Sequence, residues 1–315
     1  TWEFMARLSG KVPMVGVTAG LCYAGNAAIL GICDVIIATE DANIGMGGPA
    51  VIEGGGMGVY LPTEIGPMED QVPAGTVDVL VKDEAEAMAV ARQYLSYFQG
   101  SIDEWECGDQ RLLRHAIPEN RVSTYSVRAV IDLLADTGSV LELRPDYGIG
   151  MRTALIRVEG HPIGVIANNN EHLGGSIESE GSDKAVRFAK MCDSWNIPIL
   201  VMVDTPGMMI GPEAEKTALV RRTSNLIVTL GNVETPRFSL IIRKCYGLGA
   251  NTILFGSRRA SSFTIAWPTA EFGGMNLEAG VRLGNRDQLA AIEDIDERAA
   301  EYERLVALAY ERGGA

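Results

Sequence analysis

Two glycine-rich turns contain the residues best suited to chemistry. Gly20-Leu-Cys-Tyr-Ala-Gly25 and Tyr246-Gly-Leu-Gly-Ala250 each follow an apolar run and precede small residues. A chain that passes from a strand through such a turn into a helix presents backbone N–H groups, which can bind a phosphate or stabilise an oxyanion on a carbonyl. The phosphate-binding spacings G-x-G-x-x-G and G-x-x-x-x-G-K-[ST] do not follow a strand here, which favours oxyanion stabilisation. Tight packing of a helix on a sheet is the alternative explanation for both turns.

The side chains show no catalytic triad and no spacing typical of a metal site. His115 lies in a connector and His161 in a predicted hairpin turn, where simple exposure explains them. His172 precedes Gly174-Gly175 and is a candidate for a polar contact in a site. Asp204 ends a strand, where it could act chemically or, as we expect, cap the following turn. The chemistry is therefore expected to come from backbone groups.

Composition excludes several classes of protein. Lys and Arg number 27 against 41 Asp and Glu, and the net charge of −14 argues against a nucleic-acid partner and a polybasic membrane patch. No apolar run reaches the ~18 residues of a membrane span. Five cysteines without a C-x-x-C pair indicate reduced thiols and a cytoplasmic protein. Glycine supplies 36 of 315 residues, above the usual ~7%, so many turns need backbone without a side chain.

Short apolar runs alternate with amphipathic segments, which predicts an α/β fold with a mainly parallel sheet covered by helices. Ser182 is expected to cap a helix, residues 100–145 to form a partly helical connector, and the last helix to break near Asp294. The expected strands cover Val12–Thr18, Asp34–Ala38, Gly75–Val81, Arg152–Glu159, Pro162–Asn168, Ile197–Val203 and Phe238–Ile242. The expected helices cover Asn26–Gly31, Asp83–Phe98, Ser126–Ala135, the segment from Ser182, Glu213–Leu230 and Asn285–Arg312.

The two glycine turns belong to an internal repeat. In Pro13–Ala28 and again in Pro236–Asn251, a proline opens an apolar strand, Cys-Tyr follows nine residues later, and a small-residue helix comes next. The shared order of parts favours duplication over chance. About eighty residues, Arg157 to Pro236, lead up to the second copy, whereas twelve residues precede Pro13. We therefore expect the front of the first half to be missing from this polypeptide.

Six segments together resemble the carboxyltransferase component, or beta-type subunit, of biotin-dependent acyl-CoA carboxylases. They occur in the family's order over nearly the whole chain, and the set is specific although single segments are not. The segments are Leu8–Pro13, Gly20–Ala28, Cys192–Pro198, Val203–Gly207, Arg243–Ala250 and Ala266–Glu271. The resemblance implies a double crotonase fold of two ββα halves, with the rear of an incomplete N-terminal domain plus connector at residues 1–140 and the C-terminal domain at 141–315.

The resemblance also implies a reaction, in which carboxybiotin gives its carboxyl group to the α-carbon of a short acyl-CoA of the acetyl or propionyl type. The enolate would be held by backbone oxyanion holes, which need no acid or base side chain. Catalytic amides are implied at Ala24, Gly25, Asn26, Leu248 and Gly249. Contacts to biotin or acyl-CoA are implied at Gly174, Gly175, Gly207, Tyr246, Gly247, Ala250 and Asn251.

The same resemblance implies partners. The chain has no Ala-Met-Lys-Met biotinylation site, so the biotin carboxyl carrier and biotin carboxylase would be elsewhere. A site shared between the N-terminal half of one subunit and the C-terminal half of another would require a homo-oligomer, often a hexamer. The candidates for attracting the anionic CoA are Arg152, Arg157, Arg221, Arg222, Arg258 and Arg259.

Both turns depart from the family pattern. Ala24-Gly25-Asn26 stands where many relatives have two adjacent glycines, and Gly247-Leu248-Gly249 where they have Gly-Gly-Ala. The difference indicates a less common branch and leaves the acyl group open. The alternatives are an acyl-CoA decarboxylase subunit, a biotin-independent crotonase-like enzyme and a non-catalytic assembly subunit.

Overall fold

A computed structural model describes residues 2–257 and 259–313, in which strands and helices alternate. The strands are β1 (Val15–Thr18), β2 (Leu21–Tyr23), β3 (Val35–Thr39), β4 (Asn43–Gly45), β5 (Val79–Val81), β6 (Leu141–Glu142), β7 (Met151–Val158), β8 (His161–Asn168), β9 (Ile199–Thr205), β10 (Arg237–Tyr246), β11 (Phe263–Ala266) and β12 (Glu271–Gly273). The helices are α1 (Trp2–Leu8), α2 (Gly25–Ile32), α3 (Pro49–Gly54), α4 (Met68–Gln71), α5 (Glu84–Ser96), α6 (Val127–Leu134), α7 (Ser179–Ser194), α8 (Pro212–Glu215), α9 (Leu219–Gly231), α10 (Gly247–Ile253), α11 (Leu277–Gly284), α12 (Arg286–Ala290) and α13 (Ile295–Gly313). Short 3-10 helices are η1 (Pro62–Glu64), η2 (Tyr97–Gln99), η3 (Gln110–His115) and η4 (Leu173–Gly175). None of the helices in these ranges has both the length and the apolarity to cross a membrane.

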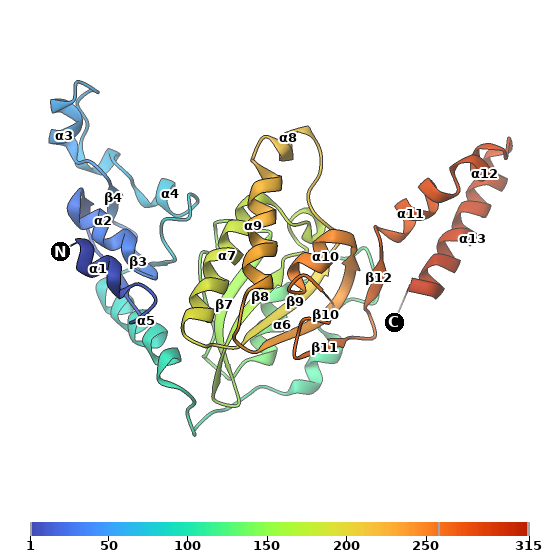
Figure 1. The fold of residues 1–315 in the computed structure, drawn as a ribbon, viewed down its shortest axis with the longest axis horizontal. Helices are drawn as coiled ribbons and strands as arrows, with labels where there is room; N and C mark the ends of the chain where they lie inside the picture. Colours follow the sequence, from blue (N-terminus) through green and yellow to red (C-terminus); the bar gives the residue numbers. More distant parts are fainter. Residues whose placement is uncertain (1, 258, 314–315) are drawn as a thin grey trace.

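The strands form three sheets. The largest has the order β11-β10-β9-β8-β7-β6, and β12 also pairs with β10. Strands β8 to β11 are parallel, whereas β6–β7 and β7–β8 are antiparallel. The smaller sheets, β1-β3-β5 and β2-β4, are parallel. Figure 1 shows the large sheet at the centre, the first sheets with α1 to α5 on one side and the arm α11 to α13 on the other, so the predicted α/β class is confirmed.

The hairpin β7–β8 lies where the sequence predicts it. Its turn residues Glu159 and Gly160 have φ values of 50° and 78°, and positive φ at both positions is typical of the type I′ hairpin turn, whose twist matches that of the strands. A β-carbon at position 160 would lie 2.1 Å from the carbonyl oxygen of Ile102. The turn therefore requires glycine both for its conformation and for space.

The N-terminal sheet and the large sheet share one hydrophobic core. Val35 and Ile37 of β3 and Tyr94 of α5 belong to the same buried cluster as Phe188 and Met191 of α7. The Tyr94 hydroxyl lies 3.3 Å from the Met191 sulfur. This core contains residues from both sides of the boundary expected at residue 140. The division into residues 1–140 and 141–315 stays a prediction.

Two expected helices differ from those observed. Helix α7 begins at Ser179 after Glu178, and Ser182 lies inside it with its hydroxyl donating to the Glu178 carbonyl at 2.7 Å, so the predicted cap is wrong. The single helix expected over Glu213–Leu230 is two helices, because Ala218 adopts a left-handed φ of 57° between them.

The break expected near Asp294 is confirmed. Helix α12 ends at Ala290 and α13 begins at Ile295. The Asp294 carboxylate accepts the N–H groups of Asp296 and Glu297, each at 2.9 Å. An aspartate at this position satisfies amides that the first turn of a helix leaves without partners.

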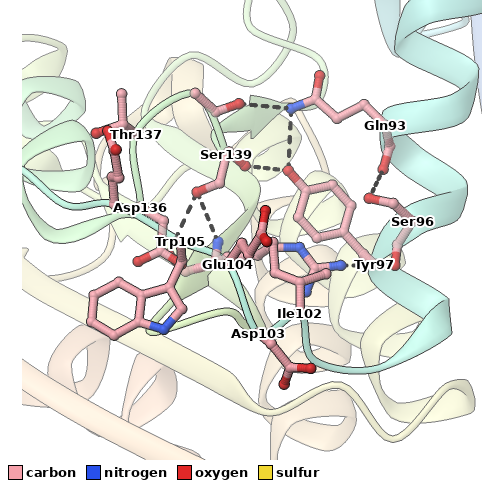
Figure 2. Close-up of a pocket in the computed structure, with 13 residues that line it drawn as sticks. Gln93, Ser96, Tyr97, Ile102, Asp103, Glu104, Trp105, Asp136, Thr137 and Ser139 are labelled. Carbon is pink, nitrogen blue, oxygen red and sulfur yellow. Dashed lines mark hydrogen bonds between the residues drawn. The ribbon is translucent and has the colours of Figure 1, made fainter.

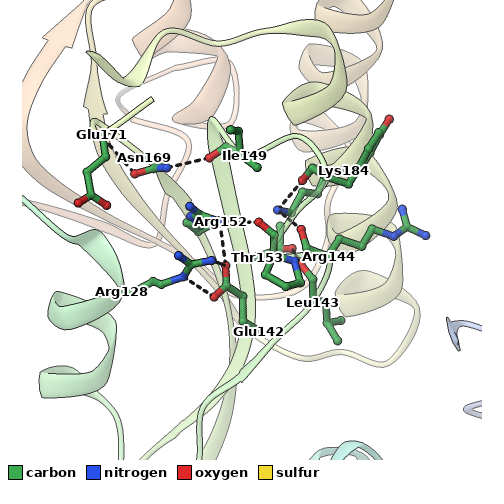
Figure 3. A network of polar contacts seen from close by, with 12 residues as sticks. Arg128, Glu142, Leu143, Arg144, Ile149, Arg152, Thr153, Asn169, Glu171 and Lys184 are labelled. Atoms are coloured by element: carbon green, nitrogen blue, oxygen red, sulfur yellow. Dashed lines mark hydrogen bonds and ion pairs between the residues drawn. The ribbon is translucent and has the colours of Figure 1, made fainter. Parts of the chain in front are cut away.

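Lys184 is a buried lysine that carbonyl groups hold in place. It is 1% exposed, and its ammonium donates to the carbonyl oxygens of Arg144 at 2.6 Å and Tyr147 at 2.9 Å, as Figure 3 shows for Arg144. Burial lowers the pKa of Lys184 to about 7, and although Glu142 raises it, nearby guanidinium groups such as that of Arg152 lower it further.

The pKa of Lys184 predicts a pH dependence of stability that Lys184→Met removes. The unfolded chain keeps the proton to about pH 10.4, whereas the folded chain releases it near pH 7. The free energy of unfolding of the wild type is therefore expected to rise with pH above 7, by up to about 1.4 kcal/mol per pH unit more than in the variant. Equilibrium urea unfolding at several pH values measures this, and parallel pH profiles would contradict it.

Candidate active site

The first glycine turn connects β2 to α2. Ala24 occupies it with φ 52° and ψ −120°, a conformation that is costly for a residue with a β-carbon. The Ala24 N–H donates to the carbonyl oxygen of Gly45 at 3.1 Å. The N–H groups of Gly25 and Asn26, which begin α2, have no acceptor among the described residues. Of the three amides predicted in this turn, Gly25 and Asn26 are therefore the available donors.

The second glycine turn connects β10 to α10 and has no room for a side chain at two positions. A β-carbon at Gly247, where φ is 57°, would lie 2.6 Å from the Gly274 carbonyl oxygen, and one at Gly249 would lie 2.6 Å from the Gly207 α-carbon. Leu248 between them is 63% exposed. Within the described ranges, the N–H groups of Leu248 and Gly249 have no acceptor. The second turn thus also presents two adjacent donors.

A third glycine turn, η4, lies against the second. A β-carbon at Gly175 would lie 2.1 Å from the carbonyl oxygen of Asp204, at the end of β9. The N–H of Ile177 donates to the Gly207 carbonyl at 2.9 Å. The structure therefore brings together four residues predicted from the sequence: Gly174, Gly175, Gly207 and Gly249.

A hollow of about 620 Å³ opens beside the second turn. It contains two predicted residues, Gly247 and Asn251, and one of the arginines considered for CoA, Arg259. The remaining lining residues are Ser257, Phe272, Gly273 and Gly274. The hollow reaches the turn at Gly247, and Leu248 and Gly249 are not among its lining residues.

Three predicted side chains contact other protein groups. Tyr246 is buried, its hydroxyl donates to the Glu271 carboxylate at 2.5 Å, and burial raises the pKa of Tyr246. Ala250 is buried as well. The Nε2 atom of His172 lies 3.3 Å from a carboxylate oxygen of Glu178. The Tyr246 and His172 side chains are therefore paired with carboxylates of this chain.

Another hollow, of about 740 Å³, has no residue of the three glycine turns in its lining. Figure 2 shows that hydrogen bonds join Gln93, Tyr97 and Ser139 along one side of it. Its lining includes the carboxylates Asp103 and Glu104. This acidic surface is unsuited to the phosphates of CoA.

Asp204 is part of a buried ionic cluster, so the expectation that it caps the following turn is wrong. Its carboxylate lies 3.3 Å from the Arg243 guanidinium and 3.6 Å from the Lys244 ammonium. The Thr205 hydroxyl accepts the Gly207 N–H instead, at 3.2 Å. The sequence analysis missed Arg243 and Lys244, although two adjacent cations in an otherwise apolar strand signal a buried carboxylate partner.

Only some of the arginines considered for CoA are available. Arg152 and Arg157 are buried and donate to backbone carbonyl groups, and Arg222 lies 3.4 Å from the Asp183 carboxylate. The other three are Arg221, which is exposed, Arg259, which lines the hollow, and Arg258, which lies outside the described residues.

The first and second turns are far apart in the chain's fold. Figure 1 shows α2 in the blue N-terminal part and α10 in the orange part, with α7 and α9 between them. The two turns therefore lie on different sides of these helices in this view.

Residues 4–312 match the family described as the carboxyl transferase domain. The chain belongs to this family. A relative named biotin-dependent acetyl-/propionyl-coenzyme A carboxylase beta6 subunit, from Mycobacterium tuberculosis (strain ATCC 25618 / H37Rv), is 32% identical over 96% of this chain and 66% of its own length. The propionyl-CoA carboxylase beta chain of Rhodococcus erythropolis is 32% identical over 97% of this chain and 65% of its own length. The carboxyl transferase chain thus spans just under two thirds of these relatives.

Solved structures agree with this assignment. One described as a single-chain, multi-domain long-chain acyl-CoA carboxylase matches all of this chain and 31% of its own, with TM-score 0.94 and 52% identity. The transcarboxylase 12S hexamer with methylmalonyl-coenzyme A bound matches all of this chain and 61% of its own, with TM-score 0.87 and 26% identity. The crotonase-like α/β architecture predicted for this carboxyl transferase chain is therefore confirmed.

The contact between Gly249 and Gly207 predicts that Gly249→Ala is destabilising. The new β-carbon would lie 2.6 Å from backbone atoms that cannot rotate away, and such overpacking typically costs about 1–3 kcal/mol. The control is Gly231→Ala at the end of α9, where no atom lies within 4 Å of the added carbon. Urea unfolding should show lower stability for Gly249→Ala only, and equal stability of the two variants would rule out the close contact.

Proposed function

We propose that this chain performs carboxyl transfer in a biotin-dependent acyl-CoA carboxylase. The observation that carries the proposal is two strand–turn–helix junctions whose amides, at Gly25 and Asn26 and at Leu248 and Gly249, have no acceptor in the described part of the chain. They occur in a member of the carboxyl transferase domain family. The N–C bond of carboxybiotin on a carrier breaks, its carboxyl group forms a bond with the α-carbon of the acyl-CoA, and the α-proton passes to the biotin nitrogen.

The first turn suits the thioester of the acyl-CoA. Loss of a proton from the α-carbon places negative charge on the thioester oxygen, and the N–H groups of Gly25 and Asn26 would donate to it. Helix α2 holds both amides in place before the charge develops, and preorganised donors of this kind stabilise a transition state more than water does. The positive end of the α2 dipole acts in the same direction.

The second turn suits the ureido group of biotin. The hollow of about 620 Å³ and the lack of side chains at Gly247 and Gly249 leave the backbone accessible to a flat polar group. The N–H groups of Leu248 and Gly249 would donate to the ureido oxygen. Gly174, Gly175 and Gly207 would form the adjoining wall, and Asn251 would contact the acyl group.

The separation of the two turns supports a site shared between copies of the chain. One copy would supply the turn at Gly25 and another the turn at Leu248, so the enzyme would be a homo-oligomer. A related structure is described as a hexamer assembly, and we propose the same state here. Biotin carboxylase and the biotin carboxyl carrier would be the other components, in the cytoplasm.

The acyl group has two candidates. The resemblance to acetyl- and propionyl-CoA carboxylases favours a short chain, as in the relatives at 32% identity. The structure at 52% identity is described as a long-chain acyl-CoA carboxylase, which favours a long chain. Leu248, an exposed side chain where many relatives have glycine, is a specific difference between this turn and theirs.

Substitutions at Gly25 test the first oxyanion hole. Gly25→Pro removes one donor N–H, and loss of such a donor is expected to lower kcat by about 100-fold or more. Gly25→Ala keeps the N–H, and its added carbon would meet only the Trp2 ring at 3.6 Å, an ordinary contact. The alanine variant should therefore keep most of the activity. Steady-state carboxylation by the assembled enzyme measures both, and equal rates for the two variants would show that this amide is not a donor.

A panel of acyl-CoA substrates tests the proposed activity itself. With bicarbonate, ATP and the partner subunits, we expect avidin-sensitive carboxylation, and kcat/KM for acetyl-, propionyl- and palmitoyl-CoA will decide between the short and the long acyl chain. Turnover that avidin does not inhibit would favour a biotin-independent crotonase-like enzyme. Release of carbon dioxide from an added carboxylated substrate such as malonyl- or methylmalonyl-CoA, without carboxylation of the unsubstituted acyl-CoAs, would favour a decarboxylase subunit. Inactivity with every substrate would favour a non-catalytic assembly subunit.

A further inference from the structure

The third glycine turn needs support from outside. Leu173, Gly174 and Gly175 have consecutive φ values of 48°, 63° and 89°. All three are left-handed, and Leu173 carries a side chain that disfavours this region. Backbone of this kind persists only where surrounding contacts hold it.

Lys244 supplies such a contact. Its ammonium donates to the carbonyl oxygen of Gly174 at 2.6 Å. Lys244 belongs to β10 and lies three residues before α10 begins at Gly247. One hydrogen bond therefore links the third turn to the strand that carries the second turn.

Asp204 holds Lys244 from the other side. One carboxylate oxygen of Asp204 lies 3.6 Å from the ammonium and also accepts the backbone N–H of Lys244 at 3.1 Å. The other oxygen lies 3.3 Å from Arg243 and 3.4 Å from the amide of Asn170. Asp204 is buried, so the Lys244 side chain, 18% exposed, is fixed between a carboxylate and a carbonyl. Because Arg243 and Lys244 surround a single carboxylate, the cluster keeps an excess of positive charge beside the turn.

The position of η4 determines the position of the second glycine turn. Gly175 packs on the Asp204 carbonyl, the Ile177 N–H binds the Gly207 carbonyl, and Gly249 packs on Gly207. These contacts leave no space for one segment to move without the next.

We infer that Lys244 is a positioning residue for carboxyl transfer. By binding the Gly174 carbonyl, Lys244 fixes the position of Gly207 and, through it, of Gly249. The Leu248 and Gly249 amides are oriented as a result. Lys244 touches no reacting atom, so its loss should reduce kcat and leave substrate binding nearly unchanged. The inference rests on the proposed function, because the role is defined for that reaction.

The test compares Lys244→Met with Lys244→Arg. Methionine keeps the length of the side chain and removes the donor, and Asp204 keeps Arg243 as a partner, so the fold is preserved. We expect kcat to fall by about 10-fold or more, as for loss of a hydrogen bond from a charged group, with KM for acyl-CoA changed less than about 3-fold. Arginine can still donate to the Gly174 carbonyl and should restore most of the rate. Hydrogen exchange of the amides at residues 173–177 should be faster in Lys244→Met than in the wild type.

Lys82→Met is the matched control, since the Lys82 side chain is 75% exposed and its ion pair with Asp83 is long, at 3.9 Å. It should leave kcat and exchange at 173–177 unchanged. If the wild type is active and Lys244→Met has the same kcat, this inference alone is overturned. It is also overturned if kcat of Lys244→Arg is no higher than that of Lys244→Met. A wild type inactive with every acyl-CoA would overturn the proposed function, and this inference with it.

Discussion

Direct contact between backbones, with no space for a side chain, is the constraint on which the candidate site depends. Gly249 lies against Gly207, and Gly175 against the carbonyl of Asp204. Any side chain at Gly175 or Gly249 would force the loops after β8 and β9 and the start of α10 apart. The contact leaves the N–H groups of Leu248 and Gly249 pointing away from protein acceptors, which is the property that oxyanion stabilisation needs.

Close packing of this kind depends on charged groups behind it. Asp204 is almost fully buried, and a buried carboxylate is tolerated only when cations and hydrogen-bond donors surround it. Arg243 and Lys244 meet this requirement. The chain is acidic overall, with net charge −14, so two adjacent cations around one carboxylate are a local exception to its charge.

The sequence predicted β1, β3, β5, β7, β8, β9 and β10, the hairpin and both glycine turns, because apolar runs and glycine clusters are local signals. It did not predict the short strands β2, β4, β6 and β12, and β2 lies within the segment Gly20–Gly25 that was expected to be a turn. It also selected Gly174, Gly175, Gly207 and Gly249, which the structure brings together. It did not predict the ionic cluster. A partnership between Asp204 and Lys244 depends on which strands are neighbours in the sheet, and spacing along the chain does not contain that information.

The cap predicted at Ser182 was wrong for a related reason. A serine inside the first turn of a helix and a serine at its cap are flanked by the same kinds of residue, so the sequence alone did not show that α7 begins at Ser179. The arginines show the same limit, since Arg152 and Arg157 could be assigned to the interior only once their carbonyl partners were known.

The central claim is that one active site uses the first turn of one copy and the second turn of another. Complementation between inactive variants tests it most directly. Gly25→Pro and Leu248→Pro each remove one proposed donor, and the two proteins are mixed as subunits and reassembled. If sites are shared in a two-fold pair, random mixing restores about a quarter of the wild-type carboxylation rate, because half of the pairs are mixed and each mixed pair has one intact site. No recovery, in oligomers shown to contain both variants, would contradict the account.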